Sequence, residues 1–250
     1  MARQPALKAR ADAAAPRIGR IDALRGLAVV AMVAYHFAFD LAYFRLTAQN
    51  FYRDPFWLHA RTAILSTFLL VAGVSLVLAQ RTSQRRVRFW RHVGIIAGCA
   101  VAVTAGSYLM FPRSFIWFGV LHGIAVSLVL ARPVVARPWI ALVLGVAVVV
   151  AGNLFASPIF DSRALGWIGF MTAKPITEDY VPLFPWAGMV LVGIAAGHAL
   201  AARDFAWLAP LGSLPAFVRW LGRHSLAVYM VHQPLLLGLL WIAAAGGRRL

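Results

Sequence analysis

The first hydrophobic stretch of the chain carries three ionisable side chains, Arg25, His36 and Asp40. His36 follows Arg25 by about three helical turns, roughly 16 Å along a helix axis, and Asp40 lies one further turn beyond His36. The three side chains therefore share one face of a helix. Ionisable residues are costly to keep inside a membrane helix, so their presence there indicates function. This stripe predicts chemistry within the membrane.

His36 is the residue of the stripe best suited to proton transfer. We expect Asp40, at i+4, to accept a hydrogen bond from one ring nitrogen of His36, which fixes the tautomer and leaves the other nitrogen as a base. Arg25 lies toward the cytoplasmic end of the same helix. There it either holds an anionic substrate or pairs with Asp22 and marks the membrane boundary.

The composition identifies the elements that must position these groups. Hydrophobic residues make up 62% of the chain, charged residues make up 13%, and the mean hydropathy is +0.77, which indicates an integral membrane protein. A helix needs about 20 apolar residues to cross the hydrocarbon core. We therefore predict an all-α, polytopic membrane helix bundle with about seven transmembrane helices. The predicted spans are 24–44, 62–80, 92–111, 115–131, 138–156, 184–201 and 225–245.

Residues 20–250 are predicted to form a single transmembrane domain, preceded by a mobile, basic cytoplasmic tail over residues 1–19. The third and fourth spans are divided only by residues 110–115, which predicts a tight hairpin with a proline in its turn. The longest outer connection, residues 157–183, is rich in aromatic residues and favours a functional loop. Residues 204–222 predict a short helix at the membrane interface.

The basic residues predict the orientation of the chain. With seven spans and a cytoplasmic N-terminus, about twice as many of the 24 Lys and Arg residues fall in inner segments as in outer ones. Short basic loops are retained in the cytoplasm, so we expect the N-terminus inside and the C-terminus outside. One span fewer would result if the final segment, interrupted by Pro234, were re-entrant.

The net charge of +16 raises the question of nucleic-acid binding, but the basic residues are divided between two faces of a membrane. We therefore expect no nucleic-acid partner. Residues 81–92 are the densest basic cluster. They either set the topology and contact anionic lipids or bind the phosphates of a soluble anionic cofactor, for which the forked side chains of Arg85, Arg86 and Arg88 are suited.

Other polar residues lie in or near the predicted spans. His122 and His232 lie well inside the fourth and seventh spans, where a histidine either joins two helices by a hydrogen bond or takes part in the reaction. Tyr229 and Gln233 accompany His232, and His59 lies near the outer mouth. We find no metal-ligand spacing of Cys and His residues, and we predict no metal site.

Four segments together resemble bacterial relatives of heparan-α-glucosaminide N-acetyltransferase, within the broader transmembrane acyltransferase superfamily. The resemblance covers most of residues 20–240. The first segment is also similar to the first helix of membrane enzymes that O-acetylate bacterial surface sugars, in which an Arg and a His are separated by ten residues, as Arg25 and His36 are here. The four segments are RIDALRGLAVVAMVAYHF at 20–37, FLLVAGVSLVLA at 68–79, WFGVLHGIAVSLVL at 117–130 and LGRHSLAVYMVHQPLL at 221–236.

The resemblance implies transfer of an acyl group, usually acetyl, from cytoplasmic acyl-CoA to a hydroxyl or amine of a sugar or glycan beyond the bacterial inner membrane. His36 would be the base or a transient acyl carrier, and Arg25 would help to hold the thioester together with the arginines of residues 81–92. The remaining polar residues would polarise the thioester carbonyl or bind the acceptor. These are His122, Tyr229, His232, Gln233 and His59.

Two other functional classes compete with an acyltransferase. A proton-coupled transporter would also use a stripe formed by Arg25, His36 and Asp40, although carriers tend to show inverted halves with matching interrupted spans, which we do not find. A haem-binding cytochrome would need two histidines at similar depth on facing helices, and a visible absorption spectrum would reveal it. The expected partners are membrane lipids, acyl-CoA and the glycan acceptor, and the apolar helix faces would permit a homodimer.

Overall fold

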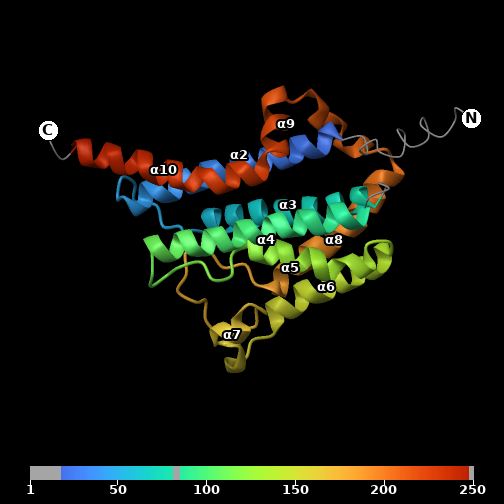
Figure 1. Cartoon of the computed structure of the whole chain (residues 1–250), viewed down its shortest axis with the longest axis horizontal. Helices are drawn as coiled ribbons and strands as arrows, with labels where there is room; N and C mark the ends of the chain where they lie inside the picture. The colour runs from blue at the N-terminus through green and yellow to red at the C-terminus, as the bar shows by residue number, and fades with distance from the viewer. Residues whose placement is uncertain (1–17, 81–84, 248–250) are drawn as a thin grey trace, which may run out of the picture. The chain divides into compact units, whose positions relative to one another are not determined.

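The computed structural model describes residues 18–80 and 85–247, and apart from one isolated bridge, between Phe118 and Tyr180, their regular structure is helical. The predicted all-α class is confirmed. An apolar helix lies at each of the seven predicted spans (Figure 1). These helices are α2 (Gly19–Tyr43), α3 (Pro55–Ala79), α4 (Arg85–Met110), α5 (Val120–Ala131), α6 (Pro138–Leu154), α8 (Leu183–Ala202) and α10 (Ser225–Gly247).

In the described residues, five helices are long and apolar enough to cross a membrane, namely α2, α3, α4, α8 and α10. They support a multi-pass membrane protein. The apolar helices Val120–Val134 and Pro138–Leu154 are shorter, below the usual length of a span. The count of seven spans and the cytoplasmic N-terminus therefore stay predictions. α10 continues as one helix past Pro234.

Several helices begin at residues away from the starts of the predicted spans, α4 among them at Arg85 rather than at residue 92, and local side-chain bonds explain two of these differences. The second helix begins at Pro55 rather than at residue 62 because Asp54 Oδ1 accepts the Phe56 N–H at 2.9 Å, which caps a helix that has proline at its first position. The fourth begins at Val120 rather than at residue 115. The preceding connection is irregular because Ser107 Oγ accepts the Ile116 N–H at 2.9 Å. The turn between α4 and α5 is thus wider than predicted.

The chain divides into two compact units, which we describe separately. One contains Leu69–Ala206, and the other contains Gly19–Phe68 together with Trp207–Leu250. The single domain over residues 20–250 stays a prediction. The predicted tail over residues 1–19 falls almost entirely in residues 1–17, outside the described residues, and α2 begins at Gly19.

In the unit formed by Leu69–Ala206, α6 and α8 pack closely together. A Cβ added to Gly188 of α8 would lie 2.6 Å from the carbonyl oxygen of Gly145 in α6. Small residues let membrane helices approach in this way. Val190 and Ile194, on the same helix, are fully buried.

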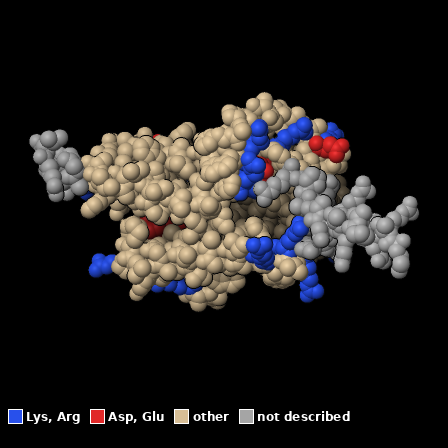
Figure 2. Space-filling view, turned by 45° about the horizontal axis from the view of Figure 1, so that its top comes forward, with Lys and Arg blue, Asp and Glu red and all other residues tan. Residues whose placement is uncertain are grey.

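In the space-filling view, most of the visible surface is neither acidic nor basic (Figure 2), as expected for a membrane protein.

In the other unit, α2 packs against α9 (Ala216–Arg223) and along α10. Gly222 of α9 backs onto the carbonyl oxygen of Asp22, so closely that any Cβ would overlap it. The short helices η3 (Ala206–Ser213) and α9 lie where the interface helix was predicted, and they leave large aromatic side chains exposed. Whether these side chains meet the membrane interface stays a prediction. The aromatic residues are Trp207, Phe217 and Trp220.

Candidate functional site

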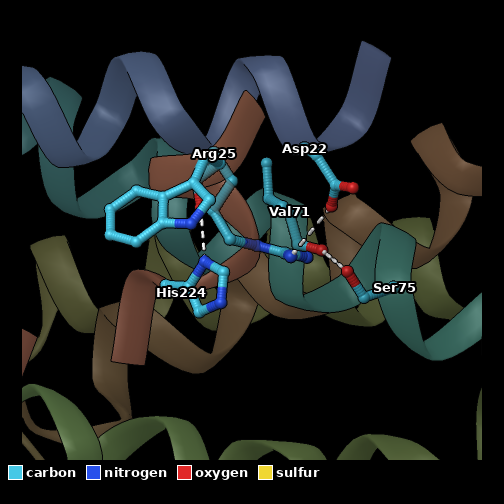
Figure 3. A network of polar contacts seen from close by, with 6 residues as sticks. Asp22, Arg25, Val71, Ser75 and His224 are labelled. Carbon is cyan, nitrogen blue, oxygen red and sulfur yellow. Dashed lines mark hydrogen bonds and ion pairs between the residues drawn. The ribbon is translucent and has the colours of Figure 1, made fainter. Parts of the chain in front are cut away.

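Helix α2 carries the predicted stripe over its whole length. Asp22 lies in the first turn, where a carboxylate interacts favourably with the helix dipole. Arg25 Nη1 lies 3.6 Å from Asp22 Oδ1, and the two side chains face each other (Figure 3). The structure therefore contains the Asp22 pairing that was one of the two sequence interpretations of Arg25. A role of Arg25 toward an anionic substrate stays a prediction.

His36, one turn before the end of the stripe, faces His232 of α10. The ring centroids are 5.0 Å apart and the ring planes are inclined at 60°. The two residues are far apart in the sequence, and the packing of α10 along α2 brings them together (Figure 1). The structure thus joins two histidines that the sequence analysis had assigned to different roles.

The ring of His232 is fixed by its own helix. Nδ1 lies 2.7 Å from the carbonyl oxygen of Tyr229. A carbonyl oxygen only accepts hydrogen bonds, so Nδ1 carries the proton, and in the neutral ring Nε2 holds an unprotonated lone pair. The side chain is 7% exposed. His232 is therefore a buried base whose tautomer is set by the backbone.

Asp40 completes the cluster, but with a different partner from the one predicted. Its Oδ1 accepts a hydrogen bond from Gln233 Nε2 at 3.1 Å, and its Oδ2 has no partner among the described residues. The predicted hydrogen bond from His36 to Asp40 is therefore wrong. The physical reason is that the His36 ring packs toward α10, where it meets the His232 ring, while the Gln233 amide supplies the donor to Asp40.

Three buried side-chain atoms in this region have no hydrogen-bond partner within the described part of the chain. They are Asp40 Oδ2, His232 Nε2 and Gln233 Oε1. All three are acceptors, and Asp40 is only 1% exposed. An unsatisfied buried polar atom costs about 1–3 kcal/mol, and such atoms in a native structure call for an explanation, often a functional one. We call Asp40, His232 and Gln233 the acceptor cluster.

An aromatic group beside His36 was missed by the sequence analysis. Tyr35 lies edge-on to Phe51 at 5.4 Å and to Trp57 at 5.8 Å between ring centroids. Phe51 is buried, with 3% of its surface exposed. These rings place apolar surface beside the C-terminal half of α2, which lowers the local dielectric and strengthens polar interactions nearby. The density of aromatic residues between positions 35 and 57 is the signal that would have found them.

His122 lies in the other unit, and its surroundings differ. The Gly119 N–H donates to Nδ1 at 3.3 Å, so in the neutral ring Nε2 carries the proton and donates to Thr104 Oγ1 at 3.3 Å. The Thr104 hydroxyl in turn donates to the carbonyl of Ile116 at 2.7 Å. Both ring nitrogens therefore have partners, and the arrangement joins α4 to the start of α5.

The remaining predicted site residues lie apart from one another in the chain. His59 is exposed and its Nδ1 lies 2.6 Å from the carbonyl of Pro55, within its own helix. Arg86 and Arg88 are exposed in the first turn of α4, where the helix dipole favours anions. The side chain of Arg85 and residues 81–84 lie outside the described residues. Binding of a cofactor by these arginines stays a prediction.

The long connection between α6 and α8 is ordered by polar contacts to the start of α5. Asp179 Oδ2 accepts the Val120 N–H at 2.7 Å, and Ser114 donates to the carboxylate of Glu178. Tyr180 donates to the carbonyl of Gly166 at 2.6 Å. Burial, with a smaller contribution from the charge of Asp161, raises the pKa of the Tyr180 phenol to about 12. These contacts hold the loop in place and need no ligand.

The arrangement in α2 and α10 suits proton transfer to or from a bound group. Two imidazoles face each other, and the buried carboxylate of Asp40 lies one turn from His36 on the same helix and is hydrogen-bonded to the residue that follows His232. Imidazole is the side chain that most often exchanges protons near neutral pH. Within residues 18–80 and 85–247, no group of three or more His, Cys, Asp or Glu side chains could hold a metal ion.

Comparison with protein families identifies the context of this chemistry. The model of the catalytic domain of heparan-alpha-glucosaminide N-acetyltransferase matches residues 17–234. The chain belongs to this family. The match includes α2 and its stripe, His122, and His232 with Gln233, and it confirms the resemblance found in the sequence. Neither the curated proteins nor the solved structures gave a significant match.

Membership of the heparan-alpha-glucosaminide N-acetyltransferase family indicates a membrane acetyltransferase. In a family of this kind the reaction requires an acyl donor and a sugar acceptor. A base that can receive a proton from the acceptor suits such a transfer. The His36 and His232 pair, with the acceptor cluster, is the candidate active site.

Proposed function

We propose that the protein transfers an acetyl group from cytoplasmic acetyl-CoA to a hydroxyl or amine of a sugar or glycan on the outer side of a bacterial inner membrane. The single observation that carries this proposal is the His36 and His232 pair beside three buried, unpartnered acceptors. Buried polar atoms without partners are expensive. A bound substrate that supplies hydrogen-bond donors explains why they are kept.

The reaction forms a bond between the acceptor and the acetyl carbon, breaks the C–S bond of the thioester, and moves one proton. The lone pair of the acceptor nitrogen or oxygen attacks the thioester carbonyl carbon, the C–S bond breaks, and the proton lost by the acceptor leaves with the thiolate as the coenzyme A thiol. His36 serves this reaction either as the base or as a transient carrier that forms an acetyl-imidazole. An apolar site excludes water, which would otherwise hydrolyse the thioester or an acetyl-imidazole.

The donor side of the proposal rests on arginine residues. Arg86 and Arg88 are exposed in the first turn of α4, and guanidinium groups bind phosphate by paired, charge-assisted hydrogen bonds. We propose that they bind the phosphates of acetyl-CoA together with Arg85. Arg25, near the start of α2, would orient the thioester end of the donor.

Acetyl transfer from labelled acetyl-CoA by the purified, full-length protein tests this function. Wild-type protein should transfer the label to an amino sugar such as glucosamine, and His36→Ala should reduce the rate by about 100-fold or more, as expected for loss of a group that transfers protons. Absence of transfer by the wild type, or an unchanged rate in His36→Ala, would contradict the proposal.

A proton-coupled transporter is the second candidate because the almost fully buried carboxylate of Asp40 shares α2 with His36, whose ring faces His232, which also suits a proton pathway. The two functions differ in their need for acetyl-CoA. A transporter in vesicles should move protons with its substrate when no acetyl-CoA is present. An acetyltransferase should release coenzyme A thiol in proportion to the acceptor consumed.

A further inference from the structure

We infer that the acceptor cluster is the subsite for the attacking group of the acyl acceptor, and that His232 Nε2, rather than His36, receives its proton. The inference rests on the proposed function, because it assigns roles within that reaction. It makes a second histidine a catalytic residue. It also gives Asp40 and Gln233 the separate task of holding the acceptor's N–H or O–H group.

The His232 ring is held in one tautomer. The hydrogen bond from Nδ1 to the Tyr229 carbonyl, at 2.7 Å, places the proton on Nδ1. Nε2 of the neutral ring therefore has a lone pair, is buried, and has no partner among the described residues. A nitrogen in this state can accept a proton but cannot donate a hydrogen bond.

The unpartnered atoms of the cluster determine which substrate it can bind. Its three unpartnered atoms, Asp40 Oδ2, His232 Nε2 and Gln233 Oε1, all require a donor. A thioester carbonyl and a phosphate offer acceptor atoms, so neither would satisfy this cluster. A primary amine or a hydroxyl of the acceptor substrate offers N–H or O–H donors. The polarisation of the thioester carbonyl predicted for His232 from the sequence therefore does not fit its unprotonated Nε2.

A hydrogen bond between two helices holds the cluster. Gln233 follows His232 directly on α10, and its amide donates to Asp40 Oδ1 of α2 at 3.1 Å. This bond ties the two helices at the cluster and fixes the direction of the other carboxylate oxygen. Asp40 Oδ2 can then accept one hydrogen of an amine while His232 Nε2 accepts another. The carboxylate also stabilises the imidazolium that forms when His232 takes the proton.

In the resulting step, the acceptor nitrogen or oxygen forms a bond to the acetyl carbon and the C–S bond of acetyl-CoA breaks. The proton of the attacking group passes to His232 Nε2, and it then leaves with the thiolate as the coenzyme A thiol. No oxidant or other reactant is needed. His36, whose ring lies 5.0 Å from that of His232, relays this proton to the departing thiolate, so it still transfers a proton in the reaction.

The test combines a spectroscopic and a kinetic measurement on the full-length protein in detergent micelles. The spectroscopic measurement is ¹⁵N NMR of protein with labelled histidine rings. The signals of His232 are assigned as those that are present in the wild-type spectrum and absent from the spectrum of His232→Gln. We expect Nδ1 to be protonated and Nε2 unprotonated, and we expect glucosamine, used as the amine probe, to shift the Nε2 signal. A neutral ring with its proton on Nε2 would overturn the inference.

In the kinetic arm, His232→Gln should transfer acetyl to glucosamine about 100-fold or more slowly, while its affinity for acetyl-CoA stays within about twofold. His224→Gln is the matched control, because His224 Nδ1 makes the same kind of bond, 2.9 Å to the Trp220 carbonyl (Figure 3), but its side chain is exposed. It should transfer at the wild-type rate. A His232→Gln rate within about threefold of wild type would overturn the inference.

Failure of the proposed function gives a different pattern. If wild-type protein transfers no acetyl group, the acetyltransferase proposal fails, and the NMR arm alone decides the subsite. A shift of the Nε2 signal with glucosamine would then still support a donor-binding cluster. No shift, with the probe at saturating concentration, would overturn the cluster as a subsite as well.

Discussion

Two histidine regions within the helices of this protein differ in how far their hydrogen bonds are satisfied. Around His122, every polar atom of the ring has a partner, from Gly119 and Thr104. Around His36 and His232, three buried acceptors have none in the described part of the chain. A satisfied buried histidine stabilises a fold, whereas unsatisfied acceptors cost stability unless a ligand completes them. Unmet hydrogen bonds therefore separate a structural from a chemical role better than burial does.

Replacing one aspartate in each region gives the sharpest contrast. Asp40→Asn should lower acetyl transfer by about tenfold or more, because an amide lacks the charge that stabilises an imidazolium, while the melting temperature should not fall, since an amide oxygen still accepts from Gln233. Asp179→Ala removes the acceptor of the Val120 N–H. It should lower the melting temperature by about 2–4 °C and leave the rate per folded molecule unchanged. A lower transfer rate in Asp179→Ala together with an unchanged rate in Asp40→Asn would contradict the comparison.

The arginines at the start of α4 test the prediction that this surface binds coenzyme A. Replacing Arg85, Arg86 and Arg88 together with Gln should weaken coenzyme A binding by about tenfold in calorimetry, because charge-assisted bonds to phosphate are lost. The matched control replaces three other exposed arginines with Gln and should bind within about twofold of wild type. If both variants bind coenzyme A as tightly as wild type does, residues 81–92 do not bind the cofactor, and they instead set the topology and contact lipids. The control arginines are Arg45, Arg53 and Arg113.

Thr104 tests the satisfied region. Its hydroxyl lies between His122 Nε2 and the Ile116 carbonyl, so Thr104→Val leaves two part-buried groups without this partner. We expect a loss of about 1–3 kcal/mol in the free energy of unfolding, measured by denaturation in detergent, with the transfer rate per folded molecule kept. A tenfold loss of rate without a change in stability would place the reaction near His122 instead.

The smallest expected effect is at Asp161, on the exposed loop. Hydrogen bonds from the Thr172 hydroxyl, at 2.6 Å, and from its backbone N–H lower the pKa of the Asp161 carboxyl. A lowered pKa in the folded state means that the stabilisation is present above the usual aspartate range and is lost as the pH falls through the folded value. Melting temperatures of wild type and Thr172→Val should therefore differ near neutral pH and converge in acid. A constant difference would contradict this.

Much of the fold could be predicted from the sequence because long apolar segments determine where membrane helices form. All seven predicted segments contain a helix. Two of the boundaries that failed depend on single side chains, Asp54 at the start of α3 and Ser107 before α5. Hydropathy does not register bonds of this kind, so it placed both helix starts wrongly.

The candidate site was predicted in part. The spacing of Arg25, His36 and Asp40 predicted that α2 carries the candidate site, since residues at these intervals share one face of a helix. The partner of His36 was not predictable, because His232 reaches it only through the packing of α10 along α2. The donor to Asp40 was predicted to be His36 and is Gln233. Tertiary pairing, which a single sequence does not encode locally, decides both contacts.

The most direct test of this account compares acetyl transfer by His36→Gln and His122→Gln, side by side, at equal concentrations of folded protein. Both substitutions remove one half-buried imidazole from a helix. We predict that acetyl transfer by His36→Gln is slower than by His122→Gln by about 30-fold or more, since only His36 faces a ring with an unpartnered acceptor, that of His232. Equal rates, or a slower His122→Gln, would contradict the assignment of the reaction to α2 and α10.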